Sequence, residues 1–180
     1  MARMNARHFR ELRAWQVAYA FKLRIYDLIE QESISRDETI HKQLREASAS
    51  APSQISEGFG RFDPVDFGRF VKMARASLVE CQNHLQDAVD RHHITEAVRE
   101  EHDKLAQEAL KEIAGLLDYL HSPEAKRNAE RIRQKRQERR QQRKQEQRNQ
   151  EQGTENEERR NQEPKNAEPR TRTQNTNPEL

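Results

Sequence analysis

The sequence QLREASASAPSQISEGFGR, residues 43–61, is followed almost at once by the tetrapeptide Asp63-Pro64-Val65-Asp66. In the first stretch, small and apolar residues recur at intervals of three and four, which is the period of a helix with one buried face. Pro52 should bend or disturb this helix, because proline has no amide hydrogen to donate to the preceding turn. Gly58 and Gly60 are expected to end the helix, and the Asp-Pro pair that follows is typical of a helix start.

Four helices are expected from the spacing of apolar residues and from capping signals. The first covers about Arg10 to Gln31, the second begins with a capping box at Ser35 and Glu38, the third begins at Asp63, and the fourth begins at Thr95 and ends before Ser122. Short connections between long helices predict an all-α fold, an antiparallel up-down four-helix bundle.

The first expected helix carries more apolar residues than one buried face requires. Its first seam consists of Trp15, Ala18, Phe21, Ile25 and Leu28, and its second of Leu12, Tyr19, Leu23 and Tyr26. The second seam indicates either a wide buried face within one monomer or a contact with another subunit.

Apolar residues and charge are distributed unevenly along the 180 residues, of which 32% are hydrophobic and 36% charged. Residues 1–121 contain 17 Lys or Arg against 20 Asp or Glu, residues 122–150 contain 11 against 4, and residues 151–180 contain 5 against 7. Almost no apolar residue follows Ser122. Three regions are therefore expected: a four-helix bundle (1–121), a basic Arg/Gln-rich segment able to form a helix (122–150), and a disordered tail (151–180).

The basic segment has two stripes of cations at four-residue spacing. They are Arg127, Arg131, Lys135, Arg139 and Arg143, and beside them Arg136, Arg140, Lys144 and Arg148. A cationic segment that lacks apolar residues favours a polyanion over a membrane as its partner. The stripes, together with Arg3, Arg7, Arg10 and Arg13 near the N-terminus, are thus candidate phosphate-binding residues for RNA or DNA.

Catalytic and metal-binding patterns are weak, and the sequence predicts no enzyme, metal or cofactor. Glu38 and His41 form the one Glu-x-x-His pair, without a second copy for a di-metal site. The His92-His93 pair and the Glu101-His102-Asp103 triplet are expected at the surface. Cys81 lies in the apolar stripe of the third helix and is expected to be an inert core residue.

The stretch from Gln43 onward resembles the signature of a family of small bacterial four-helix-bundle proteins that are encoded by intervening sequences in 23S rRNA genes. The resemblance covers roughly Phe9 to Leu120. Its matching residues are Trp15, Gln43, Arg45, Ala47, Ser50, Pro52, Ile55, Glu57, Gly58, Gly60, Ala74, Ser77, Leu78 and Glu80. Glu57 and Glu80 are expected to be partly buried carboxylates that accept hydrogen bonds from Gln43, Arg45 or neighbouring polar residues.

What the resemblance implies is a non-catalytic protein. Relatives among the accessory proteins of diversity-generating retroelements look like basic pentamers that associate with a reverse transcriptase and nucleic acid. The expected function is therefore a cytoplasmic, oligomeric accessory protein that binds RNA or DNA. Because the body of this chain is slightly acidic, phosphate binding is expected in the basic segment. The alternative is a protein-binding scaffold whose tail is a solvated spacer.

Overall fold

The computed structural model describes the backbone of residues 6–61 and 63–162, and the side chains of residues 6–61 and 63–153. Within these residues all regular secondary structure is helical. The elements are a 3₁₀ turn η1 (Phe9–Glu11) and the helices α1 (Arg13–Ile29), α2 (Glu32–Ser35), α3 (Glu38–Gly60), α4 (Pro64–Asp90), α5 (Glu96–His121) and α6 (Pro123–Gln162). The chain divides into two compact units, and the boundary between Ile132 and Arg133 falls within α6.

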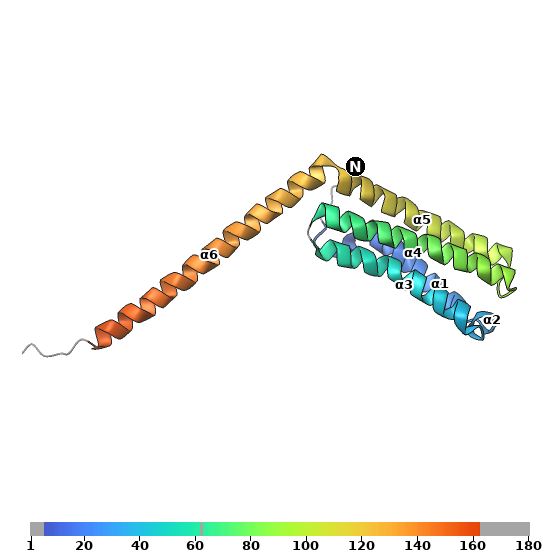
Figure 1. The fold of residues 1–180 in the computed structure, drawn as a ribbon, viewed down its shortest axis with the longest axis horizontal. Coiled ribbons are helices and arrows are strands. Elements are labelled where there is room, and N and C mark those ends of the chain that lie inside the picture. The colour runs from blue at the N-terminus through green and yellow to red at the C-terminus, as the bar shows by residue number, and fades with distance from the viewer. Residues whose placement is uncertain (1–5, 62, 163–180) are drawn as a thin grey trace, which may run out of the picture. The chain divides into compact units, whose positions relative to one another are not determined.

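Four long helices of the first unit, α1, α3, α4 and α5, lie side by side (Figure 1). Helix α1 packs against α3 and α5, and α4 packs against the same two helices. Every one of the four turns an apolar stripe inward, so the core is built from all of them. In α4, for example, Val71, Ala74, Leu78, Cys81 and Leu85 recur at intervals of three and four residues, and each of these is fully buried.

Helix α1 is shorter than predicted, because Leu12 has an extended backbone that separates α1 from η1. The first apolar seam faces the core, with Trp15 only half-buried. The second seam is divided, since Leu12 is buried whereas Tyr19 and Leu23 are 37% and 44% exposed. The Trp15 and Tyr19 rings stack with centroids 4.8 Å apart. An aromatic surface on α1 therefore remains in contact with solvent.

The start of α3 differs from the expected Ser35–Glu38 capping box. Ser35 belongs to the short helix α2, and Asp37 is the N-cap of α3. Its Oδ1 accepts hydrogen bonds from the backbone N–H groups of Thr39 and Ile40, at 3.1 and 3.2 Å. An aspartate two residues further on competes successfully with Ser35, because its carboxylate also complements the positive end of the helix dipole.

Asp37 also links the start of α3 to the turn between α4 and α5. Its Oδ2 lies 3.0 Å from Nη1 of Arg91 and 3.0 Å from Nε2 of His93, both in the turn between α4 and α5. These contacts, led by His93, lower the pKa of Asp37 from 3.8 to about 2. His93, expected at the surface, is thus partly buried, and its side chain is 20% exposed.

The contact between α3 and α4 depends on small residues. Gly58 is buried inside α3, and a Cβ atom at this position would lie 2.5 Å from Phe67 Cδ2 and 2.7 Å from Phe70 Cβ. Gly58 is therefore a close-packing point and does not end the helix, which continues to Gly60. Further along the same contact, Ser77 Oγ donates a hydrogen bond to Ser50 Oγ at 2.9 Å.

Glu57 and Glu80 do not have the predicted structural role. Both carboxylates are at least half exposed, and each pairs within its own helix. Glu57 Oε1 lies 2.7 Å from Arg61 Nη2, and Glu80 Oε1 lies 3.9 Å from His84 Nε2. Their helical positions lie outside the buried stripes, which explains why water rather than Gln43 or Arg45 surrounds them. The polar link between α3 and α4 is the serine pair instead.

His102 was expected at the surface but is 5% exposed. It precedes the buried Ala106 by four residues and Ala109 by seven, which places it on the inward face of α5. Its Nδ1 lies 2.8 Å from the carbonyl oxygen of Val98 and thereby has a hydrogen-bonding partner. The contribution of a histidine to an apolar stripe was not visible from the apolar spacing alone.

Candidate nucleic-acid interface

Helix α6 begins at the predicted position, immediately after α5. Ser122 Oγ accepts a hydrogen bond from the backbone N–H of Ala125 at 3.2 Å, and Pro123 occupies the first helical position. Ala125 is 3% exposed, and Asn128 Nδ2 donates to the Tyr119 hydroxyl at 3.1 Å. The first turns of α6 are therefore fixed to the first unit by packing and by a side-chain hydrogen bond.

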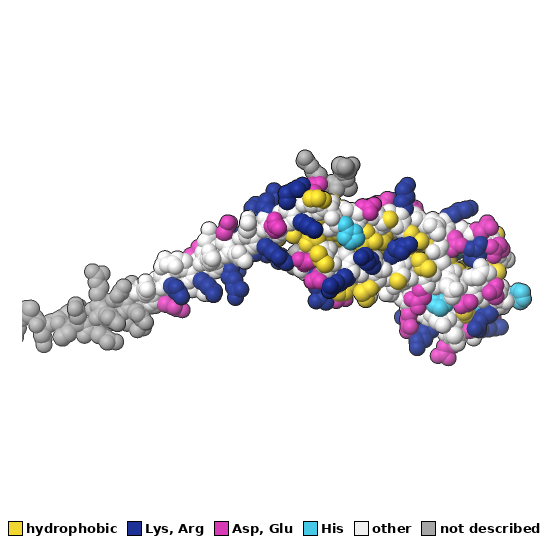
Figure 2. Space-filling model, turned by 45° about the horizontal axis from the view of Figure 1, so that its top comes forward, with side chains coloured by type: hydrophobic (Ala, Val, Ile, Leu, Met, Phe, Trp, Pro, Cys, Tyr) yellow, Lys and Arg dark blue, Asp and Glu magenta, His cyan; other side chains and the backbone are white. Residues whose placement is uncertain are grey.

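Beyond Ala129, the side chains of α6 have no apolar face. Ile132 is the last apolar residue up to position 153, and it is 46% exposed. Every side chain described from residue 130 to residue 153 is exposed. Figure 2 shows Lys and Arg side chains along the described part of this helix. The backbone is helical to Gln162, so residues 151–162 of the expected disordered tail are helical, while 163–180 lie outside the described residues.

The cations of residues 133–153 occupy one broad arc around α6. An α-helix turns by about 100° per residue, so a four-residue step advances about 40° around the axis. In a helical-wheel projection, the eight cations of residues 133–153 fall within about 220° of the helix circumference. In order around the arc they are Lys135, Arg139, Arg143, Arg136, Arg140, Arg133, Lys144 and Arg148. From Lys135 onward the two predicted stripes are thus neighbouring parts of a single surface, here called the cationic arc, whereas Arg127 and Arg131 fall outside it.

The rest of the circumference is nearly neutral. Apart from Glu138, the positions outside the arc are amides, namely Gln134, Gln141, Gln142, Gln145, Asn149 and Gln152. Gln145 Nε2 donates to Asn149 Oδ1 at 3.1 Å on this side. We call it the amide face. Within residues 133–153, the cations therefore lie on one side of α6, where Glu146 and Glu151 also lie, and mostly uncharged polar groups lie on the other.

The electrostatics of the cationic arc favour an anionic partner. Five pairs of cations in the arc are four residues apart, and each such pair costs a few tenths of a kcal/mol in an isolated helix. Phosphate groups beside the arc would remove this repulsion and gain charge-assisted hydrogen bonds, in particular from the planar guanidinium groups. The helix would therefore become more stable when a polyanion binds.

The remaining predicted phosphate-binding residues lie outside the cationic arc. Arg127 and Arg131 are exposed on α6, within the first unit. Arg13 Nη2 already forms an ion pair with Glu108 Oε1 at 2.8 Å. Arg10 Cζ lies 5.7 Å from the centre of the Phe9 ring, and Arg7 is exposed. Arg3 lies outside the described residues.

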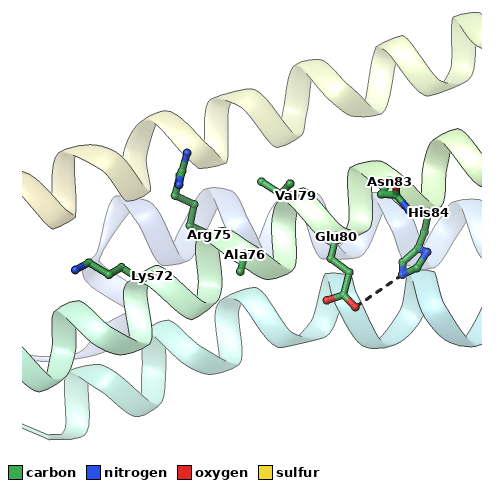
Figure 3. Close-up of a pocket in the computed structure, with 7 residues that line it drawn as sticks. All are labelled: Lys72, Arg75, Ala76, Val79, Glu80, Asn83 and His84. Atoms are coloured by element: carbon green, nitrogen blue, oxygen red, sulfur yellow. Dashed lines mark ion pairs between the residues drawn. The ribbon is translucent and has the colours of Figure 1, made fainter.

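A shallow depression on α4 was not predicted from the sequence. Its lining residues are Lys72, Arg75, Ala76, Val79, Glu80, Asn83 and His84. All seven belong to one helix, as Figure 3 shows, so no second element provides an opposite wall around a small molecule. Lys72 and Arg75 lie at one end, and the Glu80–His84 pair lies further along the helix (Figure 3). The depression therefore has the geometry of an open surface rather than that of an active site.

Other chemically reactive groups of the described residues have structural environments. Cys81 is fully buried, and burial raises the pKa of its thiol, which keeps it protonated. The described residues contain no cluster of three or more His, Cys, Asp or Glu that could hold a metal ion. None of the described helices combines the length and the apolar composition needed to span a bilayer.

Comparison with known proteins agrees with the fold. A crystal structure from Bacteroides thetaiotaomicron, of a protein of unknown function from the S23 ribosomal protein family, superposes with a TM-score of 0.53. The sequences are 19% identical, and the match covers 58% of this chain and 97% of the other, so the likeness concerns the fold alone. No curated protein matches the chain. The family described as 23S rRNA-intervening sequence protein matches residues 10–115, and the chain belongs to this family.

Proposed function

We propose that the protein is a non-catalytic accessory protein that binds RNA or DNA through α6, with little preference for sequence. The observation that carries the proposal is the cationic arc, in which eight cations share one side of a helical segment, residues 130–153, whose side chains are all exposed. Such a row of cations can neutralise several phosphates at once and gains affinity by releasing counterions.

The composition of α6 supports nucleic acid over a membrane as the partner. A membrane-surface helix needs an apolar face, and residues 133–153 contain no apolar side chain. The same residues contain no aromatic side chain on which a base could stack. Binding through α6 should therefore depend on phosphates, and sequence preference has to come from the body or from a partner protein.

The first unit supplies the platform in this proposal. We describe it as an antiparallel up-down four-helix bundle, which is supported by the mutual packing of α1, α3, α4 and α5 and by their short connections. An assembly of several copies would place several α6 helices on one nucleic acid and raise the affinity through avidity. A cytoplasmic enzyme acting on RNA, such as a reverse transcriptase, is the partner that the family resemblance suggests.

Salt dependence of binding tests the proposal. The full-length chain should bind mixed-sequence nucleic acid with a log–log salt slope of roughly −4 to −5, if about six cations contact phosphates. Replacing Arg131, Lys135, Arg139 and Arg143 by Gln should flatten this slope and leave the helical content unchanged. A matched control replaces Arg36, Lys42, Lys104 and Lys111, exposed cations of the first unit, and should retain the slope. Equal slopes for the two variants would refute binding through α6.

The exposed aromatic surface of α1 favours a second candidate, an oligomeric protein-binding scaffold. Tyr19 and Leu23 are more than a third exposed, and Lys22 Nζ lies 5.2 Å from the centre of the Tyr19 ring. A protein partner that docks on this surface would bury apolar groups, and its affinity would change little with salt. Salt-independent capture of a partner, together with no affinity for nucleic acid, would support the scaffold over the first proposal.

A further inference from the structure

The breadth of the cationic arc carries information about the shape of the partner. Lys135 and Lys144 are nine residues apart, which is about two and a half helical turns, so they project from opposite sides of α6. Arg139 and Arg148 are also nine residues apart and are opposed in the same way. A single strand or a flat anionic surface can lie against only one of these sides at a time.

From this arrangement we infer that α6 binds in the major groove of double-stranded DNA, with the two edges of the cationic arc facing the phosphates of opposite strands. The inference rests on the proposed function and names its substrate class. Edge one is defined as Lys135 and Arg139, and edge two as Lys144 and Arg148. The remaining four cations lie between the edges on the wheel.

The dimensions of helix and groove agree with this placement. An α-helix with side chains is about 10–12 Å across, and the major groove of B-form DNA is about 12 Å wide. From Lys135 to Arg148 the helix rises about 20 Å, which covers roughly six base pairs. The major groove of A-form RNA is deep and narrow and does not admit a helix so readily. Duplex DNA is therefore favoured over duplex RNA.

The amide face is the side turned away from the groove. Gln134, Gln141 and Gln145 carry no charge, so they gain less from phosphates than Lys or Arg do and are well hydrated in the open mouth of the groove. A helix that lay on one strand would have no use for cations over about 220° of its circumference, because half a circumference is enough to face one strand. The broad cationic arc and the amide face together indicate a partner that presents phosphates on two opposite sides of the helix.

The experiment compares two variants of identical chemistry in the full-length chain. The edge-one variant carries Lys135→Gln and Arg139→Gln, and the edge-two variant carries Lys144→Gln and Arg148→Gln. With mixed-sequence duplex DNA, each should reduce the magnitude of the log–log salt slope by about 1.8, because two phosphate contacts at about 0.9 each are lost. A control with Gln141→Ala and Gln145→Ala on the amide face should leave the slope unchanged.

Two further probes are single-stranded DNA and duplex RNA of the same length and sequence. The inference predicts tighter binding to duplex DNA than to either of them at every salt concentration. It is overturned if one edge variant loses slope while the other behaves like the original chain, or if single-stranded DNA or duplex RNA binds as tightly as duplex DNA. Salt-dependent binding in these cases leaves the proposed function intact, whereas a lack of binding to all three probes refutes the proposed function itself.

Discussion

Gly58 offers a quantitative test of how α3 and α4 pack. Replacing it by alanine would place a Cβ atom 2.7 Å from Phe70 Cβ and 2.5 Å from Phe67 Cδ2. Carbon atoms in contact prefer a separation of about 3.5–4.0 Å, so one of the helices has to move by about 1 Å. The Phe67 ring can rotate away, but Phe70 Cβ is attached to the backbone of α4 and can move only with the helix.

The expected effect is the difference between two opposing contributions. Overpacking of a close contact costs about 1–3 kcal/mol, and the higher helix propensity of alanine returns about 1 kcal/mol. Because the clash includes an atom fixed to the backbone, the cost should lie near the upper end of its range. Gly58→Ala should therefore lower the free energy of unfolding by about 2 kcal/mol.

Gly60 is the matched control, since it belongs to the same helix and has open space around it. A Cβ atom at Gly60 would meet no other atom within 4 Å, and its backbone has no positive φ angle. Gly60→Ala should thus raise the stability by up to about 1 kcal/mol. Urea denaturation followed by circular dichroism would measure both variants. If Gly58→Ala were as stable as the original chain, or if both variants shifted equally, the close contact would be refuted.

Three further predictions concern the first unit. Leu78→Ala should destabilise it by about 2–5 kcal/mol in the same denaturation assay, because Leu78 is fully buried, and a change under about 0.5 kcal/mol would contradict the register of α4. The pKa of Asp37 is about 2 in the folded chain and 3.8 without its partners. The ionised carboxylate therefore makes its full contribution to the stability of the folded state above about pH 4, and this contribution is lost as the pH falls towards 2. Between pH 4 and pH 2, the melting temperature should fall more steeply for the original chain than for Asp37→Asn, which retains a capping side chain. If the melting temperatures of the two proteins fell in parallel, the Asp37 carboxylate would not be the cause of the pH dependence. We also propose that the chain assembles as a pentamer with Trp15, Tyr19 or Tyr26 at the subunit contact, so light scattering should give a pentameric mass that Tyr19→Glu reduces, and a monomeric original chain would end the proposal.

Much of the fold was predictable because its helices obey local rules. Asp63 with Pro64, Thr95 and Ser122 are helix starts in both the sequence prediction and the structure. Their chemistry is complete within one helical turn, so it can be read without knowledge of the tertiary structure. The apolar stripes were predictable for the same reason, since their spacing of three and four residues is a property of the isolated helix.

The errors arose where a residue's role depends on a neighbouring helix. Gly58 looked like a helix terminator, but its function is set by Phe67 and Phe70 across the contact. Glu57 and Glu80 have charges that suggest ion pairs between helices, whereas their positions on the wheel turn them towards solvent. A helical wheel drawn for each expected helix would have moved both carboxylates to the surface. It would not have found the clash at Gly58, because that distance depends on how closely two helices approach.

Charged residues are also spaced differently in the first unit and in residues 133–150 of α6. Cations of the first unit are frequently matched by carboxylates, as in Arg24 with Glu101 across two helices and Arg61 with Glu57 within one. In residues 133–150 none of the eight Lys or Arg residues has a carboxylate four residues away in either direction, although Glu138 and Glu146 follow Lys135 and Arg143 by three residues. Opposite charges four residues apart would have stabilised the free helix without making it longer. At four-residue spacing the cationic arc instead contains five pairs of like charges, and we expect such a helix to gain stability when a polyanion binds.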